Sequence, residues 1–335
     1  MKNSSIMMLV FLFFTVASTG LKSQEKLKVL ASASIFQDMA AHIGGEKITA
    51  TSIVPIGGDP HLYEPVPSDV AKVQGADIIL INGLTFEGWI SQLVENSGTQ
   101  ATSVLITEGV NPLGSSVYEN ATDPHAWMDA SNGLIYARNI YNAIIEVDPD
   151  NSSYYKERYD TYVTQLKELD TYISTQIKTI PEFKRVLITS HDAFAYYGHR
   201  YGIELSAIMG ISTEAEAQTS DVMRVISDIK ERGVPAVFIE STINPKLVKQ
   251  IASDTGAKIG GELYADSIGE EGSPGHGYIE MLRHNTDVIV QALTLESIDT
   301  DSSKSDTETN YLIYVGIGLF LLLAFLFLVY FIQRK

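Results

Sequence analysis

The chain has 335 residues, of which 45% are hydrophobic, so it is long enough to fold as about two domains with a substantial core. Its formal net charge of −17 argues against a nucleic-acid partner, because phosphates require a basic surface. The chain contains no cysteine. This excludes disulfides, thiolate metal ligands and cysteine nucleophiles, and it suits a compartment outside the cytosol.

The N-terminal segment has the layout of a signal peptide. A lysine precedes an apolar run over 6–16, and small residues follow over 17–20. We therefore predict that residues 1–24 direct export and that cleavage falls between Ala17 and Gln24. The alternative is an uncleaved membrane anchor, which the shortness of the apolar run disfavours.

The body of the chain alternates strand-like and helix-like segments. Short β-branched runs predict strands over 28–34, 48–55, 76–83, 103–109, 185–190, 204–210, 236–242 and 257–263. Helix-like segments lie over 36–45, 67–75, 86–97, 133–147, 219–233 and 244–256. This alternation predicts an α/β fold with parallel sheets covered by helices. We assign two Rossmann-like lobes, over 25–150 and 181–295.

One long helix is predicted between the lobes, over 151–180. Apolar residues recur at spacings of three and four, at Tyr162, Leu166, Leu169, Ile173 and Ile177, which is typical of an amphipathic helix. A helix of this length is about 40 Å long. Such a rigid connection predicts limited hinge motion between the lobes.

The C-terminal region reads as a stalk and a membrane anchor. Residues 296–310 are polar and acidic, which predicts a flexible stalk. Residues 311–332 are apolar and uncharged and precede Arg334 and Lys335, which predicts a transmembrane helix with a cytoplasmic C-terminus. We therefore expect an exported body tethered to the outer face of the cytoplasmic membrane, in the periplasm or at the cell surface.

Four candidate ligands follow predicted strands. His61 and His125 belong to the first lobe, and His191 and Asp266 belong to the second. In open α/β sheets, ligands bind beyond the C-terminal ends of the strands. If the lobes face each other, three imidazoles and one carboxylate converge in the interlobe cleft and suit a divalent transition metal.

Both histidines of the first lobe end an Asp-Pro-His tripeptide. The proline stiffens the backbone, and we expect Asp59, Asp123 and, beside His191, Asp192 to accept the second imidazole N–H. The alternative is ordinary turn chemistry, since Asp-Pro is a common turn pair. Of the other histidines, His276 is the alternative ligand because it lies in a glycine-rich loop close to Asp266.

These segments together resemble the metal receptors of ABC importers, the solute-binding proteins for zinc and manganese. The resemblance covers the whole body and rests on GGDPHLYEPVPSD, DPHAWMD, ITSHDAFAYYGHRYG, TEAEAQTSD and GELYADSIG. It implies two lobes joined by a rigid helix, with the metal at their interface. It also implies a monomeric receptor without enzymatic activity that delivers metal to an ABC permease and its separate ATPase. The implied metal ligands are His61, His125, His191 and Asp266.

The metal is zinc or manganese, bound as one transported divalent ion. Three nitrogen ligands and one carboxylate favour zinc. However, receptors with this ligand set resemble proteins that accept both metals, and the region SSVYENATD lacks the histidine-rich loop of dedicated zinc receptors. The chain also lacks the lipobox cysteine of many members, so we expect the C-terminal helix to replace a lipid anchor.

Three other functions remain open at this point. A metal-dependent hydrolase would use Glu240 or Glu262 as its base, but the chain has no H-E-x-x-H motif and four ligands leave little room for water. A cell-surface adhesin of the same fold would bind a host or matrix independently of metal. A receptor for an organic solute is disfavoured because the predicted cleft loops carry no evident aromatic or arginine clamp.

Overall fold

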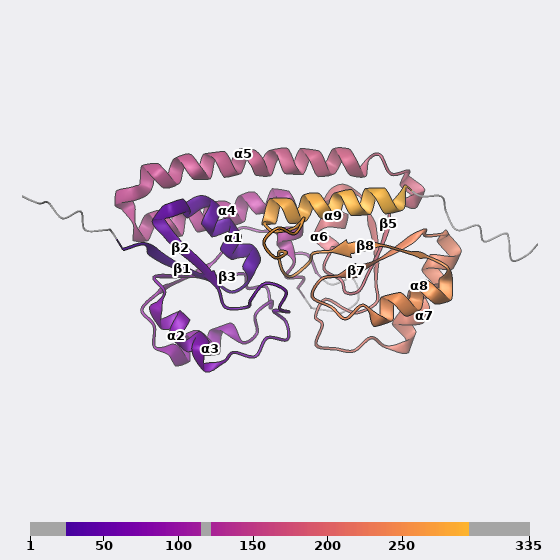
Figure 1. Cartoon of the computed structure of the whole chain (residues 1–335), viewed down its shortest axis with the longest axis horizontal. Helices are drawn as coiled ribbons and strands as arrows, with labels where there is room; N and C mark the ends of the chain where they lie inside the picture. The colour runs from indigo at the N-terminus through magenta and orange to yellow at the C-terminus, as the bar shows by residue number, and fades with distance from the viewer. Residues whose placement is uncertain (1–24, 115–121, 295–335) are drawn as a thin grey trace, which may run out of the picture.

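The computed structural model describes residues 25–114 and 122–294. Two α/β lobes lie side by side along the long axis of the molecule, and one long helix runs over both (Figure 1). The first lobe contains β1 Leu27–Ala31, α1 Ser34–Gly44, β2 Ile48–Ser52, α2 Pro67–Gly75, β3 Ile78–Ile81, α3 Ile90–Ser97, β4 Thr102–Leu105, η2 Ala126–Met128 and α4 Ala130–Val147. The second contains β5 Val186–Thr189, α6 Ala195–Tyr201, β6 Glu204–Ala207, α7 Thr219–Arg232, β7 Ala236–Glu240, α8 Lys246–Thr255, β8 Lys258–Leu263 and α9 Tyr278–Leu293.

The first lobe is built on a four-stranded parallel sheet with the order β2-β1-β3-β4. Side chains alternate across it, as the pleat of a strand requires. Val29 and Ala31 of β1 join the core that includes α1 and α4, whereas Leu30 joins a second cluster with α2 and α3. Helices therefore cover both faces of the sheet, which confirms the α/β fold with parallel strands.

The second lobe differs from the first in its pairing. Its strands form two parallel pairs, β5-β6 and β7-β8, rather than a second four-stranded sheet. The register of β7-β8 shifts between Val237 and Phe238, near Gly261, whose φ is 146°. Side chains of β5 and β7 still share one core with α7 and α8. The pairs thus lie in one lobe although no continuous ladder joins them in the described residues.

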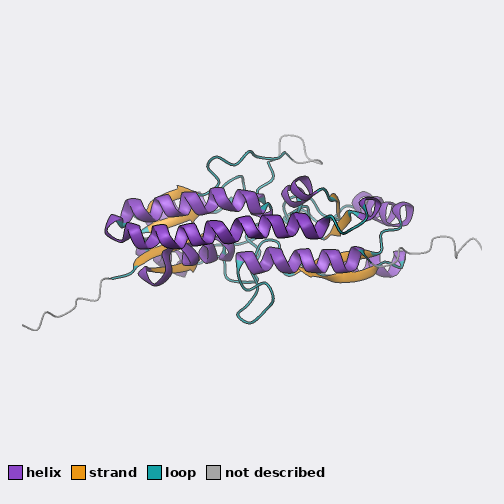
Figure 2. Ribbon diagram, turned by 90° about the horizontal axis from the view of Figure 1, so that it is seen from above, coloured by secondary structure: helices purple, strands orange, loops and turns teal. Residues whose placement is uncertain are grey.

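The long helix α5, Ser152–Ile177, begins one residue after the predicted start at 151. The residues buried along it are Tyr155, Tyr162, Leu166, Leu169, Ile173 and Ile177. It ends short of the predicted Ile180 because the backbone tightens: Ile180 N–H donates to the carbonyl of Ile177 at 3.1 Å, just before Pro181. Figure 2 shows α5 lying along both lobes, with strands to either side.

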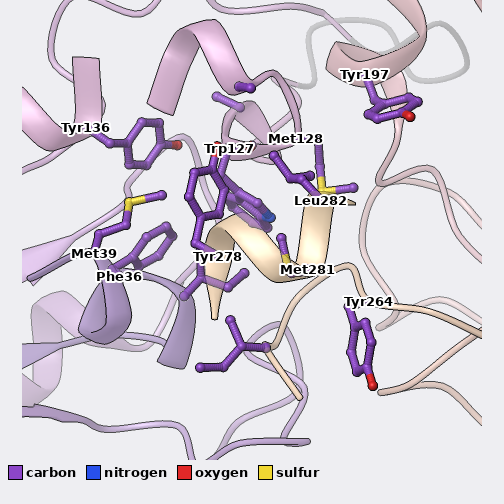
Figure 3. Close-up of a cluster of buried hydrophobic side chains, with 14 of the residues drawn as sticks. Phe36, Met39, Trp127, Met128, Tyr136, Tyr197, Tyr264, Tyr278, Met281 and Leu282 are labelled. Carbon is purple, nitrogen blue, oxygen red and sulfur yellow. Dashed lines mark hydrogen bonds between the residues drawn. The ribbon is translucent and has the colours of Figure 1, made fainter. Parts of the chain in front are cut away.

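The lobes share one hydrophobic core (Figure 3). The Phe36 ring of α1 meets Trp127 edge-on, with ring centroids 5.5 Å apart. Trp127 Nε1 donates to the Ala265 carbonyl of the second lobe at 2.9 Å, and the Tyr278 hydroxyl of α9 donates to the Trp127 carbonyl at 2.6 Å. An apolar interface of this kind opposes independent movement of the lobes.

The predicted fold class needs one correction, which concerns the C-terminal transmembrane helix. No helix in the described part of the chain is long and apolar enough to cross a membrane. The predicted helix over 311–332 lies outside that part, as do the predicted signal peptide over 1–24 and stalk over 296–310. The described residues therefore form two α/β lobes joined by a long helix.

Candidate metal centre

The structure brings the four predicted ligands together. His61 lies between β2 and α2, His125 directly precedes η2, His191 follows β5, and Asp266 follows β8. One ligand atom from each lies within 4.8 Å of all the others. His276 is not in the group: it is exposed, and its Nδ1 lies 3.0 Å from the Ser273 carbonyl.

The Nε2 atoms of the histidines face one another. His61 Nε2 lies 3.3 Å from His125 Nε2, which lies 3.4 Å from Asp266 Oδ1. His191 Nε2 lies 3.2 Å from Asp266 Oδ2. The exposed fraction is 8% for His61 and at most 1% for His125, His191 and Asp266. The centre is therefore almost completely shielded from bulk solvent.

Several of these buried polar atoms have no hydrogen-bond partner among the described residues. They include both carboxylate oxygens of Asp266 and Nε2 of His191. Such atoms are costly inside a protein unless a bound group satisfies them. A cation between the imidazoles and the carboxylate does so, because all of these atoms act as metal ligands. The residues present therefore fit a divalent metal.

Carboxylates behind two of the histidines fix their orientation. Asp123 Oδ1 lies 2.8 Å from Nδ1 of His125 and accepts its backbone N–H at 2.8 Å. Glu240 Oε1 accepts the backbone N–H of His191 at 2.9 Å, and Oε2 lies 2.6 Å from its Nδ1. In both cases a proton on Nδ1 leaves Nε2 free to bind metal.

Two of the three predicted carboxylate partners were wrong. Asp59 does not take the imidazole N–H of His61: its Oδ1 accepts the backbone N–H of His61 at 2.9 Å. Asp192 donates its own N–H to the Gly210 carbonyl, and Glu240 stands behind His191 instead. Glu240 could have been found as the last residue of β7, because β7 lies beside β5, the strand that precedes His191. From the sequence alone, Glu240 is a candidate only for the base of a hydrolase.

An apolar wall borders the centre. The ring of Phe86 meets that of His61 edge-on at 5.1 Å between centroids. Phe86 follows Leu84 and Thr85, whose φ angles are 52° and 69°. These are unfavourable for residues other than glycine. Glu87 supports the strained loop, because its carboxylate accepts the backbone N–H groups at both 82 and 83.

The electrostatics of the centre follow from burial and charge. Burial, followed by the nearby charges of His125 and His191, lowers the pKa of His61 to about 3 despite the attraction of Asp266. Burial also disfavours a charged His125, but Asp123 and Asp266 outweigh it and raise its pKa to about 9. For Asp266, His191 and His125 outweigh burial and hold the pKa well below its usual range. The carboxylate is therefore an anion.

The two lobes bury three imidazoles and one carboxylate between them. This arrangement places the chain in the class of two-lobed metal-binding proteins. The chain belongs to the family whose model is described as the zinc-uptake complex component A, periplasmic, which matches residues 29–292. This confirms the resemblance seen in the sequence. The family is one of receptors in uptake complexes, so the chain is not an enzyme.

Named relatives agree with this membership. The manganese-binding lipoprotein MntA of Halalkalibacterium halodurans is 39% identical over 271 residues, covering 81% of this chain and 89% of the relative. The iron ABC transporter substrate-binding lipoprotein MtsA of Streptococcus pyogenes is 36% identical over 300 residues, covering 85% and 95%. These relatives are named lipoproteins, so they give the predicted helical anchor no support.

Solved structures share the fold over the whole body. The periplasmic zinc-binding protein TroA of Treponema pallidum has a TM-score of 0.77 and 31% identity, covering 81% of this chain and 100% of that chain. A manganese-bound periplasmic metal-binding protein of Candidatus Liberibacter asiaticus has a TM-score of 0.74 and 30% identity, covering 80% and 100%.

Proposed function

We propose that His61, His125, His191 and Asp266 hold one divalent metal ion, zinc or manganese, as transported cargo. The protein is an extracytoplasmic receptor that passes this ion to an ABC permease driven by a separate ATPase chain. The observation that carries the proposal is the buried Asp266 carboxylate, which faces two Nε2 atoms and has no hydrogen-bond partner among the described residues. The relatives named for manganese, iron and zinc support the class of cargo.

The donor set favours zinc in affinity while accommodating manganese. Three imidazole nitrogens and a carboxylate suit tetrahedral zinc, and zinc lies above manganese in the Irving–Williams order. Both oxygens of Asp266 face the centre, near Nε2 of His125 and of His191 respectively. A bidentate carboxylate gives a fifth donor to an ion that prefers more oxygen ligands. We therefore expect both metals to bind, with zinc more tightly held.

The two lobes divide the ligands equally. We propose domains over 25–150 and 181–295, with 151–180 as the connection. His61 and His125 come from the first, and His191 and Asp266 come from the second, so a bound ion ties the domains together. Delivery therefore requires a change that separates these pairs, and contact with the permease is the natural trigger.

Neither Glu240 nor Glu262 suits the role of general base that the hydrolase alternative requires. Glu240 is 2% exposed and is committed to His191 through both carboxylate oxygens. Glu262 is exposed on β8. A general base must reach a metal-bound water within hydrogen-bond distance, and Glu240 already has its partner. Membership of a receptor family disfavours the adhesin as the primary role.

A metal count on the purified full-length chain tests the proposal. After removal of metal with a chelator, we expect calorimetric titration with zinc, then manganese, to give one equivalent of each. His191→Ala should abolish tight binding. His276→Ala is the matched control, because this exposed imidazole lies outside the group, and it should bind as the unaltered chain does. Failure of both metals to bind the unaltered chain contradicts the proposal.

A further inference from the structure

His61 is the ligand that is least constrained by its surroundings. It is the most exposed of the four. Across residues 25–114 and 122–294, no hydrogen bond forms to its Nδ1, whereas carboxylates stand behind His125 and His191. Its position depends on the loop that carries it. Metal therefore passes to and from solvent most easily on the His61 side.

One segment of the second lobe reaches this loop. Residues 208–218, between β6 and α7, are called the cleft strap here. The first residues of the strap form hydrogen bonds with the two neighbours of His191. Met209 N–H donates to the Ser190 carbonyl at 2.9 Å, and Asp192 N–H donates to the Gly210 carbonyl at 3.2 Å. The strap therefore begins at one metal ligand and extends towards another.

The strap contacts the His61 loop through Thr213. The hydroxyl of Thr213 donates to Oδ2 of Asp59 at 2.6 Å. The other oxygen of Asp59 accepts the backbone N–H of His61 at 2.9 Å. One carboxylate thus joins the strap to the His61 loop, through a hydroxyl–carboxylate bond of the short, charge-assisted kind.

A second cross-lobe contact holds the start of the same loop. Gly57 N–H donates to Oγ of Ser267 at 2.8 Å, and Ser267 is 1% exposed and close to Ser34. Both this contact and the Thr213–Asp59 contact are partly buried, and Gly57 itself is exposed. The His61 loop is therefore held from the second lobe at two points, its start by Ser267 and the residues next to His61 by Thr213. Behind the strap lies a cavity of about 290 Å³, bordered by Ile208, Met209 and Gly210.

We propose that Thr213 is a positioning residue that holds the His61 loop closed over the bound ion and sets its release rate. The inference rests on the proposed function. Thr213 does not touch the ion; it acts through Asp59 on the backbone of His61. Breaking its bond leaves His61 able to swing away, while His125 and His191 keep the carboxylates behind them.

Release kinetics of the full-length chain test this role. Each variant is loaded with one equivalent of zinc and mixed rapidly with excess chromogenic chelator. Thr213→Val keeps the shape and removes the hydroxyl, so we expect release to accelerate about tenfold, as the loss of one hydrogen bond to a charged group predicts. The stoichiometry should remain one, and the association rate should change much less.

Two controls separate this role from a general loss of structure. Thr213→Ser restores the hydroxyl and should restore the slow release. Ser212→Ala removes a hydroxyl of the same strap that accepts only from Glu214 N–H, and release should stay unchanged. Thr213→Val with unaltered release, or Ser212→Ala with equal acceleration, overturns the inference. An unaltered chain that binds no zinc instead contradicts the proposed function, so the two failures are distinct.

Discussion

Glu240 contacts His191 twice, at its backbone N–H through Oε1 at 2.9 Å and at its Nδ1 through Oε2 at 2.6 Å. Both residues are almost completely buried. The two contacts fix the position of the main chain and the orientation of the ring at once. They keep the proton on Nδ1 and aim Nε2 at Asp266.

Replacing Glu240 by glutamine should therefore weaken metal binding. The variant keeps the size of the side chain but loses the negative charge beside Nδ1. We expect zinc affinity to fall about 10–100-fold, the usual effect of altering a carboxylate behind a metal-binding histidine. Competition against a chelator of known affinity measures it. Glu262→Gln, an exposed change on β8, should leave affinity unaltered, and equal effects of the two changes would contradict this assignment.

A buried carboxylate outside the metal centre should make stability depend on pH. Burial raises the pKa of Glu87 to about 7, although hydrogen bonds from Ser32 and from backbone N–H groups oppose the change. The folded chain then binds more protons than the unfolded chain between the ordinary pKa and about 7. Its free energy of unfolding must fall as pH rises through that window, by about 3 kcal/mol from this group.

Urea unfolding of the metal-free chain at about pH 4.5 and 8 checks this dependence. The comparison is with Glu87→Gln, which has no charge to bury. The free energy of unfolding of the unaltered chain, relative to the variant, should decrease by about 3 kcal/mol as pH rises. A constant difference would mean that the N–H donors hold the carboxylate near its ordinary pKa.

The sequence indicates the four candidate donors through local signals, and the structure places these side chains together. His61 and His125 follow a stiff Asp-Pro pair, and His191 directly follows a strand, so chain order alone places them in loops. The long helix can also be predicted from the sequence, because the spacing of its apolar residues depends only on neighbouring helical turns. Parallel strands follow from their alternation with helices.

The features that the sequence does not predict depend on contacts between distant segments. Glu240 reaches His191 only because β7 lies beside β5, and Thr213 reaches Asp59 only across the cleft. Neighbouring residues such as Asp192 looked like better partners because chain distance was the only guide. Periodicity also does not reveal the division of the second lobe's strands into two pairs or the register shift near Gly261.

Metal should raise thermal stability through its ties to both lobes. At a free zinc concentration a thousand times the dissociation constant, binding adds about 4 kcal/mol to the free energy of unfolding. A chelator should remove this gain, seen as a lower Tm by calorimetry. His61→Ala should lose most of the gain at the same zinc concentration, whereas His284→Ala, a partly buried histidine outside the group of four ligands, should keep it. Equal gains in both variants would exclude His61 as a ligand.

The packing of α4 against α9 allows a test of the shared interlobe core. A Cβ on Gly133 would lie 2.9 Å from the Tyr278 hydroxyl oxygen and 3.1 Å from its Cε1. The tyrosine cannot yield cheaply, because it is fully buried and its hydroxyl donates to Trp127. Gly133→Ala should therefore cost about 1–3 kcal/mol of unfolding free energy, despite the better helix propensity of alanine.

Gly75→Ala is the matched control, since a Cβ at this helical glycine meets nothing within 4 Å, and it should be neutral or slightly stabilising. Urea unfolding measures the free energy of unfolding of both variants. Equal values for the two variants would show that the lobes are not packed tightly at α4 and α9.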